Sequence, residues 1–474
     1  MLFQTAIFVL LFIGTLVVFY RFPQRFRLPA LGISSLLFYA ASGLIDFILL
    51  IAVISVSYQL SLRVRPGGPK WPLVAGILLL FGSLAYFKYG GFLYENTNHL
   101  LAALASPSLP RFGGAVLPLG ISFYTFQIVA YLVDLYKGRA ESRVGFLRYI
   151  VFIMFFGQLI AGPIMRGSEY LGQLTNLKGA NRGDVQAGVS LILLGIVKKV
   201  LIADSIAGMV DTRFADYGSL SQSDAWIAAY LFAFQIFFDF SGYVNIALGL
   251  GRLLGINLSE NFRTPYLSRG PAEFWGRWHI TLSQWFRDYL YIPLGGNRGG
   301  RFREVANLMA VMVIAGLWHG AGWQFAIWGA VHGVYLVVGR VLPSDALRRL
   351  LPFPSPLRER TYNAISVFIF FHLTVLAWIP FRSPDLPTTV GMVTTAFRPE
   401  GIAQWVNQIE MFALILGLFG LHIAERIVTE FKPVRSRTDW PVPRVAVGIA
   451  AATVVLIILM TAGSTSNDFI YFRF

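Results

Sequence analysis

Apolar runs long enough to cross a bilayer recur along this chain from residue 3 to residue 462, and only short polar stretches separate them. A membrane-spanning helix needs about 20 consecutive apolar residues. Only 13% of the 474 residues are charged and 56% are hydrophobic, so the chain lacks the polar surface that a soluble protein of this size requires. The pattern therefore predicts an all-α polytopic membrane protein, because helices satisfy their backbone polar groups internally within a bilayer.

Several of the candidate spans are short or are interrupted by glycine and proline. The interruptions include Gly157–Pro163 and the turn at Trp318–Gly320. Irregular backbone at membrane depth needs cover from protein or from a water-filled cavity. We therefore expect about eleven true spans, together with re-entrant or interfacial helices. The candidates are 3–20, 29–45, 46–62, 71–88, 91–105, 116–136, 146–164, 186–207, 225–250, 304–318, 320–339, 362–381, 405–427 and 443–462.

No linker, low-complexity tract or internal repeat divides the chain, so we treat residues 1–474 as a single membrane domain with a catalytic core at about 115–340. The first apolar run, Leu2–Tyr20, has no basic residue before it and no small-residue cleavage site after it. We therefore interpret this run as a retained span and not as a cleaved signal.

The net charge of +15 is concentrated in the loops between the apolar runs. Nucleic-acid binding is one interpretation of this charge, but the positive-inside rule explains it better. The basic loops are then cytoplasmic and both termini periplasmic. Lys178, Arg182, Lys198 and Lys199 fit badly with a simple crossing, which favours a re-entrant or interfacial segment around 157–200. The basic loops are Arg21–Arg27, Arg63–Lys70, Lys137–Arg148, Arg252–Arg303, Arg340–Arg360 and Arg426–Arg444.

Missing motifs exclude or disfavour several kinds of chemistry. The chain contains no cysteine, which excludes disulfides, thiolate metal sites and a cysteine nucleophile. No Walker A sequence and no G-x-S-x-G elbow occur, so neither ATP-driven transport within this chain nor a hydrolase-type serine is supported. No H-E-x-x-H motif or other close cluster of histidine with carboxylates is present, so no bound metal is expected.

A polar stretch in the middle of the chain, Ala272–Gly320, carries two histidines. His319 follows an apolar run and precedes Gly320, and the small residue would let a substrate or another backbone approach the imidazole. A neutral imidazole has a pKa near 6.5 and can take a proton from a hydroxyl, so His319 is a candidate general base. The alternative is a structural histidine bonded to a carbonyl. His279 could line the same cavity, or it could belong to an interfacial belt with the nearby tryptophans.

The remaining histidines are expected to be structural. His332 would lie about 20 Å from His319 along a straight helix, too far to share a proton. His372 and His422 fall in apolar spans, and His99 lies near a loop. Asp239 also falls within apolar sequence, where we expect it to pair with a buried arginine or to cap a helix end.

Charged residues of the stretch Ala272–Gly320 allow two interpretations. They are a cytoplasmic basic face under the positive-inside rule, or they hold the phosphates of an acyl-carrying cofactor or an acidic carrier protein. The second interpretation makes Arg287, Asp288 and Arg298 candidate donor-binding residues. The wider set is Arg277, Arg287, Asp288, Arg298 and Arg301.

Several long motifs, in order, carry a family resemblance over the whole chain. They are Leu117–Gln127, Gly157–Ile164, Phe238–Tyr243, Glu260–Tyr266, Phe274–Tyr289, Gly316–Gly320 and the closing Phe469–Phe474. With these motifs the chain resembles the bacterial membrane-bound O-acyltransferases of the alginate O-acetylation type.

The resemblance implies helices around a central funnel or tunnel, with His319 as the essential histidine and His279 as the second family histidine. It implies transfer of an acyl group from a cytoplasmic thioester, acetyl-CoA or another acetyl thioester, toward the outer face of the bacterial inner membrane. No bound cofactor is expected. In relatives of this branch, a periplasmic SGNH-type acetyltransferase finishes the transfer onto an exopolysaccharide, together with polysaccharide biosynthesis proteins. The oxyanion would need donors, for which Trp318, Asn261 or backbone N–H groups are candidates.

Three alternatives for the function stay open at this point. The D-alanylation branch shares the histidine motifs, although the Pro293–Asn297 loop and the long part after residue 360 favour acetylation. Within the acetylation branch, alginate is one of several acceptors, alongside cellulose and other polysaccharides. A lipid O-acyltransferase of the same superfamily would have a membrane lipid as its acceptor. A secondary transporter or export component would also have broken helices, but it predicts inverted repeats, and none is visible.

Overall fold

The computed structural model describes residues 3, 5–110, 117–341 and 354–430, and every regular element in these ranges is helical. This confirms the expected all-α class. Six helices in the described part are long and apolar enough to cross a membrane, and the expected number of about eleven spans stays a prediction. The six are Leu44–Ser61, Trp71–Ala103, Arg182–Ala215, Gln222–Leu253, Ser355–Arg382 and Ile409–Val428. The expected span 443–462 and the closing motif Phe469–Phe474 lie outside the described residues.

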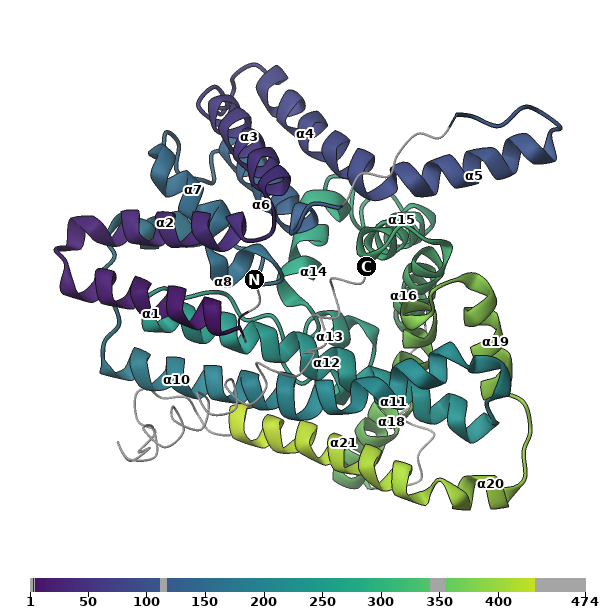
Figure 1. The fold of residues 1–474 in the computed structure, drawn as a ribbon. Coiled ribbons are helices and arrows are strands. Elements are labelled where there is room, and N and C mark those ends of the chain that lie inside the picture. Colours follow the sequence, from purple (N-terminus) through teal and green to yellow (C-terminus); the bar gives the residue numbers. More distant parts are fainter. Residues whose placement is uncertain (1–2, 4, 111–116, 342–353, 431–474) are drawn as a thin grey trace. The chain divides into compact units, whose positions relative to one another are not determined.

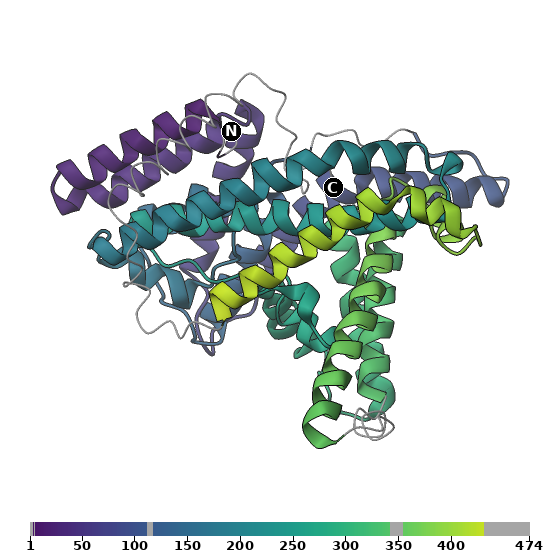
Figure 2. The same ribbon diagram turned by 90° about the horizontal axis from the view of Figure 1, so that it is seen from below.

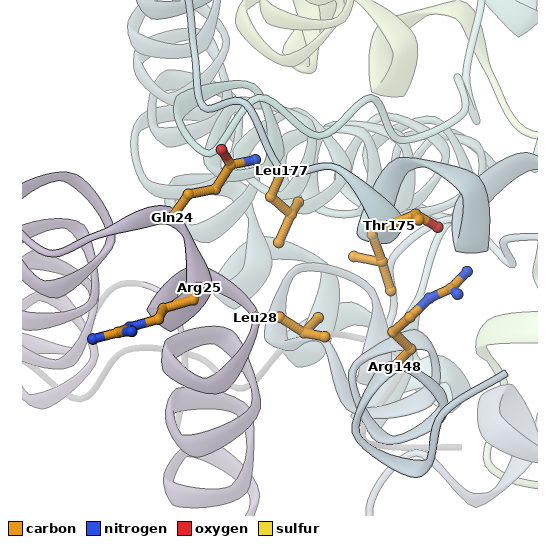
Figure 3. A pocket seen from close by; sticks show the side chains of 7 residues that line it. Gln24, Arg25, Leu28, Arg148, Thr175 and Leu177 are labelled. Carbon is orange, nitrogen blue, oxygen red and sulfur yellow. The ribbon is translucent and has the colours of Figure 1, made fainter.

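The described helices form two compact units. The first contains the described residues of Met1–Val197 together with Gly242–Ser259 (Figure 1). Its helices are α1 (Ala6–Arg21), α2 (Arg27–Ala40), α3 (Leu44–Ser61), α4 (Trp71–Leu84), α5 (Gly90–Ala103), α6 (Ile121–Tyr136), α7 (Phe146–Met154), α8 (Phe156–Leu159), α9 (Gly167–Thr175) and α10 (Arg182–Ile196). A cavity in this unit is lined by the α1–α2 connection, α7 and the end of α9 (Figure 3).

The second unit contains Lys198–Ser241 and the described residues from Glu260 onward. The long helix α12 (Gln222–Leu253) contributes to both units. In the second unit α16 packs against α15 and α18, and Figure 2 shows α16 and α18 alongside each other. The other helices are α11 (Asp204–Ala215), α13 (Pro271–Trp275), α14 (Ile280–Phe286), α15 (Arg301–His319), α16 (Trp323–Val341), α18 (Ser355–Arg382), α19 (Leu386–Ala396), α20 (Ile402–Asn407) and α21 (Ile409–Glu430).

The interrupted segment at Gly157–Pro163 is covered by protein. The chain leaves helical geometry at Phe155, and residues 155–165 are all buried. The carbonyl of Phe152, near the end of α7, accepts hydrogen bonds from the side-chain amides of Gln127 and Gln158. Irregular backbone is therefore supplied with internal partners here, as burial in an apolar environment requires.

Two buried lysines lie inside a membrane helix. α10, the π-helical segment η3 (Val197–Ala203) and α11 form the continuous helix Arg182–Ala215. A re-entrant break at Lys198 and Lys199 is therefore wrong, because one continuous helix contains both, whereas the interfacial alternative stays a prediction. The irregular backbone at 155–165 fits the re-entrant part of the expectation. The prediction considered only the positive charge of this segment, and the sequence does not show that carboxylates elsewhere in the fold neutralise these lysines.

Each lysine has an acidic partner within the second unit. Lys198 Nζ lies 2.5 Å from Glu425 Oε1 on α21. Lys199 Nζ lies 2.7 Å from Asp204 Oδ1 and 2.8 Å from Asp239 Oδ1. Asp239 therefore pairs with a lysine, where the sequence led us to expect an arginine or a helix cap. Buried charges of opposite sign in contact are the arrangement that a membrane interior tolerates.

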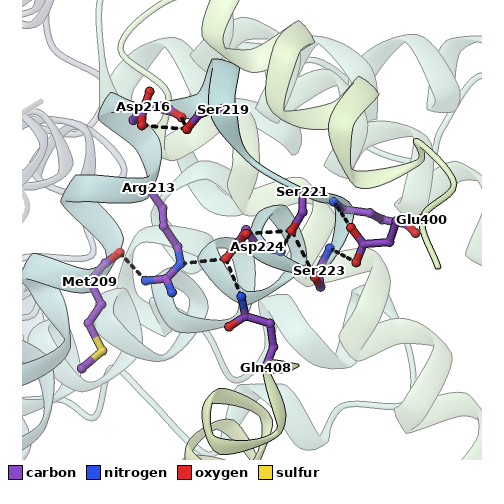
Figure 4. Close-up of polar contacts among 10 residues, drawn as sticks. Met209, Arg213, Asp216, Ser219, Ser221, Ser223, Asp224, Glu400 and Gln408 are labelled. Atoms are coloured by element: carbon purple, nitrogen blue, oxygen red, sulfur yellow. Dashed lines mark hydrogen bonds and ion pairs between the residues drawn. The ribbon is translucent and has the colours of Figure 1, made fainter. Parts of the chain in front are cut away.

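The N-terminus of α12 is anchored by polar contacts from distant parts of the second unit (Figure 4). Glu400 accepts hydrogen bonds from the backbone N–H groups of Gln222 and Ser223, at 2.8 and 2.9 Å. Asp224 accepts a hydrogen bond from the Gln408 amide at 3.1 Å and lies 3.7 Å from Arg213. A carboxylate at a helix N-terminus satisfies otherwise unbonded N–H groups and favours the helix dipole.

The lysine cluster predicts a specific stability defect. Lys199→Met leaves Asp204 and Asp239 facing each other without their cation, and breaking a buried pair in this way costs about 3–5 kcal/mol. We expect a clearly lowered unfolding midpoint in detergent, and partial recovery in the double variant Lys199→Met/Asp239→Asn. The control is Arg263→Met, because the Arg263–Glu260 pair is half-exposed and should contribute at most about 1 kcal/mol. An unchanged midpoint for Lys199→Met would contradict the assignment.

Candidate functional site

His279 sits at a strained turn of the backbone. The short helix α13 ends at Trp275, and the next helix, α14, begins at Ile280. His279, the residue directly before α14, has a φ of +43°, in the left-handed region that residues with a Cβ seldom adopt. Thr264, in the neighbouring loop, has a φ of +37°. Strained backbone of this kind persists where the surroundings hold it and is common at functional sites.

Asn261 fixes the protonation pattern of the His279 ring. Its Oδ1 accepts hydrogen bonds from the Thr281 backbone N–H at 3.1 Å and the Thr281 hydroxyl at 3.0 Å, so this atom is the amide oxygen. The same oxygen lies 3.2 Å from His279 Nδ1. Because an amide oxygen can only accept, Nδ1 carries the proton, and in the neutral ring the lone pair is on Nε2.

The His279 imidazole is fully buried. Phe240 and Phe262 pack against its ring, with centroid distances of 4.9 and 6.3 Å. Burial lowers the pKa of His279 to about 3, because the cation would lose its solvation. The neutral form with its free-base nitrogen is therefore the form present near neutral pH.

His319 is the last residue of α15, where the chain reverses direction through Gly320–Gly322 into α16. Glycines allow the two helices to pack closely. A Cβ on Gly316 would lie 2.1 Å from the carbonyl oxygen of Phe325, and a Cβ on Gly320 would lie 2.1 Å from the Phe325 ring. The small residues at this turn therefore admit the neighbouring helix, and this contact fixes the direction of the His319 backbone.

Aromatic rings enclose His319, which is 3% exposed. Its ring centroid lies 4.9 Å from Trp318, 5.1 Å from Trp328 on α16 and 5.1 Å from Phe381 on α18. Three helices of the second unit thus build one apolar wall around the imidazole. Electrostatic interactions are strengthened in such a water-poor site.

Trp318 links the two histidines. Its indole lies 4.9 Å from the His319 ring and 6.3 Å from the His279 ring. The structure therefore brings together four of the residues that the sequence singled out, His279, His319, Asn261 and Trp318. They come from the Glu260–Tyr266 motif, the start of α14 and the end of α15.

His332 lies much closer to His319 than we expected. Its ring is 4.9 Å from Trp328, which in turn contacts His319 at 5.1 Å, so one indole separates the two imidazoles. The estimate of about 20 Å assumed a single straight helix, and the reversal at Gly320–Gly322 makes that assumption wrong. Phe325, Trp328 and His332 are three and four positions apart, so a helical pattern places them on one face of α16. This spacing could have predicted from the sequence that they share that face.

The fully buried His332 sits in a cluster of aromatic rings. Phe274, Trp275 and Trp378 lie 5.7, 5.1 and 6.4 Å from it. Neither ring nitrogen of His332 has a hydrogen-bond partner among the described residues. The same holds for the buried indole nitrogen of Trp328, which we did not single out from the sequence. Sequence periodicity alone does not distinguish an aromatic cluster that belongs to a site from ordinary core packing.

The charged candidates lie farther from the histidines. Arg287 follows α14, whose seven residues separate it from His279 by about 10 Å. It pairs with its neighbour Asp288 at 2.7 Å. Arg298 belongs to the exposed loop before α15, and the 19 residues of that helix place its start about 28 Å from His319. Any ligand that contacts both the loop and His319 must be extended.

The basic loop is held against the first turns of α15. Asn307 donates to the Gly296 carbonyl at 2.9 Å, and Arg303 donates to the Leu294 carbonyl at 3.3 Å. Gly295 and Gly296 have φ values of +110° and +58°, which require residues without a Cβ. Arg298 and Arg301 remain exposed at its surface. Among the described residues, no group of three or more His, Asp or Glu side chains could hold a metal ion.

A comparison with protein families matches a region that includes Asn261, His279, Trp318 and His319. A family model described as MBOAT, membrane-bound O-acyltransferase family, matches residues 136–379. The chain is 35% identical to a probable alginate O-acetylase, AlgI, of Pseudomonas aeruginosa, over 89% of this chain and 82% of that protein. It is 35% identical to a peptidoglycan O-acetyltransferase of Helicobacter pylori, over 85% of this chain and 81% of that protein. It is 30% identical to a teichoic acid D-alanyltransferase of Streptococcus thermophilus, over 56% of this chain and 68% of that protein.

Buried, neutral His279 predicts a pH-dependent component of stability. The pKa of about 3 in the folded protein lies below the usual 6.5, so the unfolded chain binds the proton first and stability falls as the pH drops below about 6.5. One pKa unit corresponds to about 1.4 kcal/mol, so the loss at pH 5 relative to pH 8 is about 2 kcal/mol.

The measurement compares the native protein with His279→Asn. Asparagine keeps an N–H donor for Asn261 but has no titrating ring. The unfolding midpoint of the native protein should fall more between pH 8 and pH 5 than that of the variant. Equal pH dependence in the two proteins would show that His279 is not held neutral.

Proposed function

Since the chain belongs to the membrane-bound O-acyltransferase family and is an acyltransferase, we propose that it moves an acetyl group from a cytoplasmic thioester across the bacterial inner membrane for O-acetylation of an extracellular polysaccharide such as alginate. The observation that carries the proposal is the pairing of His279 and His319 around one indole, in a buried aromatic site. Relatives named as acetylases of alginate and of peptidoglycan support a sugar hydroxyl as the acceptor.

In the proposed reaction His319 is the general base. Its imidazole takes the proton of the acceptor hydroxyl while the hydroxyl oxygen forms a bond to the thioester carbonyl carbon. The carbon–sulfur bond then breaks, the proton passes to the leaving thiolate, and an ester and a free thiol result. The enclosure by Trp328 and Phe381 supports this role, because excluding water prevents hydrolysis of the thioester.

His279 has a different role in this scheme. Its strongly lowered pKa disfavours the imidazolium, so it fits a hydrogen-bond acceptor better than a carrier of the proton. Nδ1 donates to Asn261, and the lone pair on Nε2 would accept a hydrogen bond from a neighbouring hydroxyl of the sugar acceptor, because the attacking hydroxyl gives its single proton to His319. The Asn261 oxygen is occupied by three donors, which leaves its amide N–H₂ group, and the Trp318 indole N–H, as candidates for stabilising the oxyanion.

The polarity of α15 supports transfer from the inside to the outside. The basic loop at its N-terminus is cytoplasmic under the positive-inside rule, and His319 lies at the other end of the helix. Acetyl-CoA or another acetyl thioester would bind with its phosphates near Arg287 and Arg298, with Asp288 holding the Arg287 side chain, and reach inward with its acyl arm. A periplasmic SGNH-type acetyltransferase and polysaccharide biosynthesis proteins would receive the group outside, and both termini would be periplasmic.

A D-alanyltransferase is the second candidate function. The similarity to the Streptococcus thermophilus enzyme covers 56% of this chain. The lower identity and the smaller coverage favour O-acetylation over this alternative.

Replacement of His319 tests the proposed chemistry. Reconstituted protein with labelled acetyl-CoA, an acceptor polysaccharide and the periplasmic partner should transfer label, and His319→Ala should lower the rate by about 10²–10⁴-fold because the general base is lost. His372→Ala is the matched control, because His372 bonds to the Phe368 carbonyl away from the site and its loss should leave the rate unchanged. Normal acetylation by His319→Ala would overturn the assignment, and transfer of D-alanine but not acetate would support the second function.

The donor-binding part of the proposal makes a separate prediction. Arg298→Ala should raise the KM for the acetyl thioester several-fold and leave kcat nearly unchanged, because a phosphate contact in the exposed loop acts on binding and not on the chemical step. Arg63→Ala, in another basic loop, is the control with the same loss of charge. An equal effect of the two substitutions on KM would refute a specific donor site at the Arg298 loop.

A further inference from the structure

The cavity in the first unit has an apolar floor and a polar rim. Its volume is about 460 Å³. Figure 3 shows Leu28 and Leu177 between the two arginines, with the Arg25 guanidinium pointing away from the leucines. The seven lining residues are Gln24, Arg25, Leu28, Arg148, Leu174, Thr175 and Leu177. An arrangement of this kind suits a ligand with one charged end and one apolar end.

The rim is electrically positive. Arg148 forms a two-pronged pair with Glu141 through its Nη atoms, at 3.1 and 2.7 Å. Its buried Nε has no hydrogen-bond partner among the described residues. Glu141 is the one acidic residue in the two basic loops, Arg21–Arg27 and Lys137–Arg148, that meet at this cavity. Excess positive charge therefore remains to attract an anion.

Neighbouring side chains hold the shape of the cavity. Arg27 donates to the Leu177 carbonyl at 2.6 Å and to the Phe19 carbonyl at 3.2 Å. Gln24 donates to the Asn176 side chain at 2.8 Å. These bonds tie the α1–α2 connection to the segment after α9. Exposed Arg25 is not needed for these ties, so it can turn toward a ligand.

The position of the cavity along the chain favours a lipid as the ligand. Both loops at its rim carry the basic residues that the positive-inside rule places in the cytoplasm, and the cytoplasmic leaflet is the one rich in anionic lipids. α1 exposes Val17, Val18 and Tyr20 near the connection, as a helix facing acyl chains would. Basic pockets between membrane helices on this side are suited to phosphate headgroups.

We propose that this cavity binds an anionic phospholipid, with the headgroup phosphate at the exposed Arg25 and an acyl chain over Leu28, Leu174 and Leu177. The inference does not depend on the proposed acyl transfer. The phosphates of a thioester donor share the charge of a headgroup, but they bring no acyl chain long enough for the leucine floor. Binding of the donor is therefore an outcome that the test distinguishes.

The test measures lipid retention by the purified full chain. Delipidated protein is incubated with phosphatidylglycerol or phosphatidylcholine in nanodiscs, and bound lipid is counted by native mass spectrometry. We expect at least about fivefold preference for phosphatidylglycerol, weakened by salt because the contact is partly exposed. Arg25→Glu should remove most of this preference, and Arg25→Lys should keep most of it. Arg65→Glu, an exposed arginine in another basic loop, is the matched control and should leave the preference unchanged.

Three outcomes would overturn the proposal. Equal retention of the two lipids would show that the rim does not select an anion. An equal effect of Arg25→Glu and Arg65→Glu would show that only general surface charge matters. Displacement of phosphatidylglycerol by micromolar coenzyme A would assign the cavity to donor phosphates. Acetyl transfer is not a readout here, so failure of the lipid site and failure of the proposed function are separate results.

Discussion

A polar group in an apolar environment needs its partner within the protein, because neither lipid nor a packed core supplies one. This constraint explains features of both units. The Phe152 carbonyl receives two side-chain amides where the backbone leaves helical geometry. Lys199 is set between two carboxylates on α11 and α12. The irregular backbone and the buried charge in this membrane protein are thus arranged around internal partners.

The same constraint gives the candidate site its chemical character. One amide oxygen, Asn261 Oδ1, gathers donors from Thr281 and His279, and this determines which nitrogen of His279 carries the proton. Aromatic walls then keep the imidazole neutral, because burial without a counter-charge disfavours the cation. A neutral imidazole with a defined tautomer and a restricted ring can accept a hydrogen bond from a substrate, which is the role proposed for His279.

The sequence predicted the fold class, and it singled out the two histidines that the structure places on either side of Trp318, because apolar run length and motif order are properties of the chain itself. It failed where a long-range contact decides the outcome. The carboxylate that neutralises Lys198 is 227 positions away, so local charge counting suggested a re-entrant segment where a continuous helix exists. His332 was assigned a distance along a straight helix, but the reversal at Gly320–Gly322 returns α16 past His319. The glycines that permit this reversal were visible, whereas the direction of the returning helix depends on packing against Phe325.

The length of α15 bears on how an acyl group could cross a membrane. About 28 Å separates the basic loop from His319, close to the thickness of the hydrocarbon core. In the proposed reaction the charged part of the donor stays at the loop, and only a neutral acyl arm extends along the helix. Moving phosphates into the apolar interior would cost far more free energy than moving a thioester. In the proposed reaction, the separation of the arginines from the histidines, which at first argues against a shared site, is therefore the distance that the acyl arm of the donor spans.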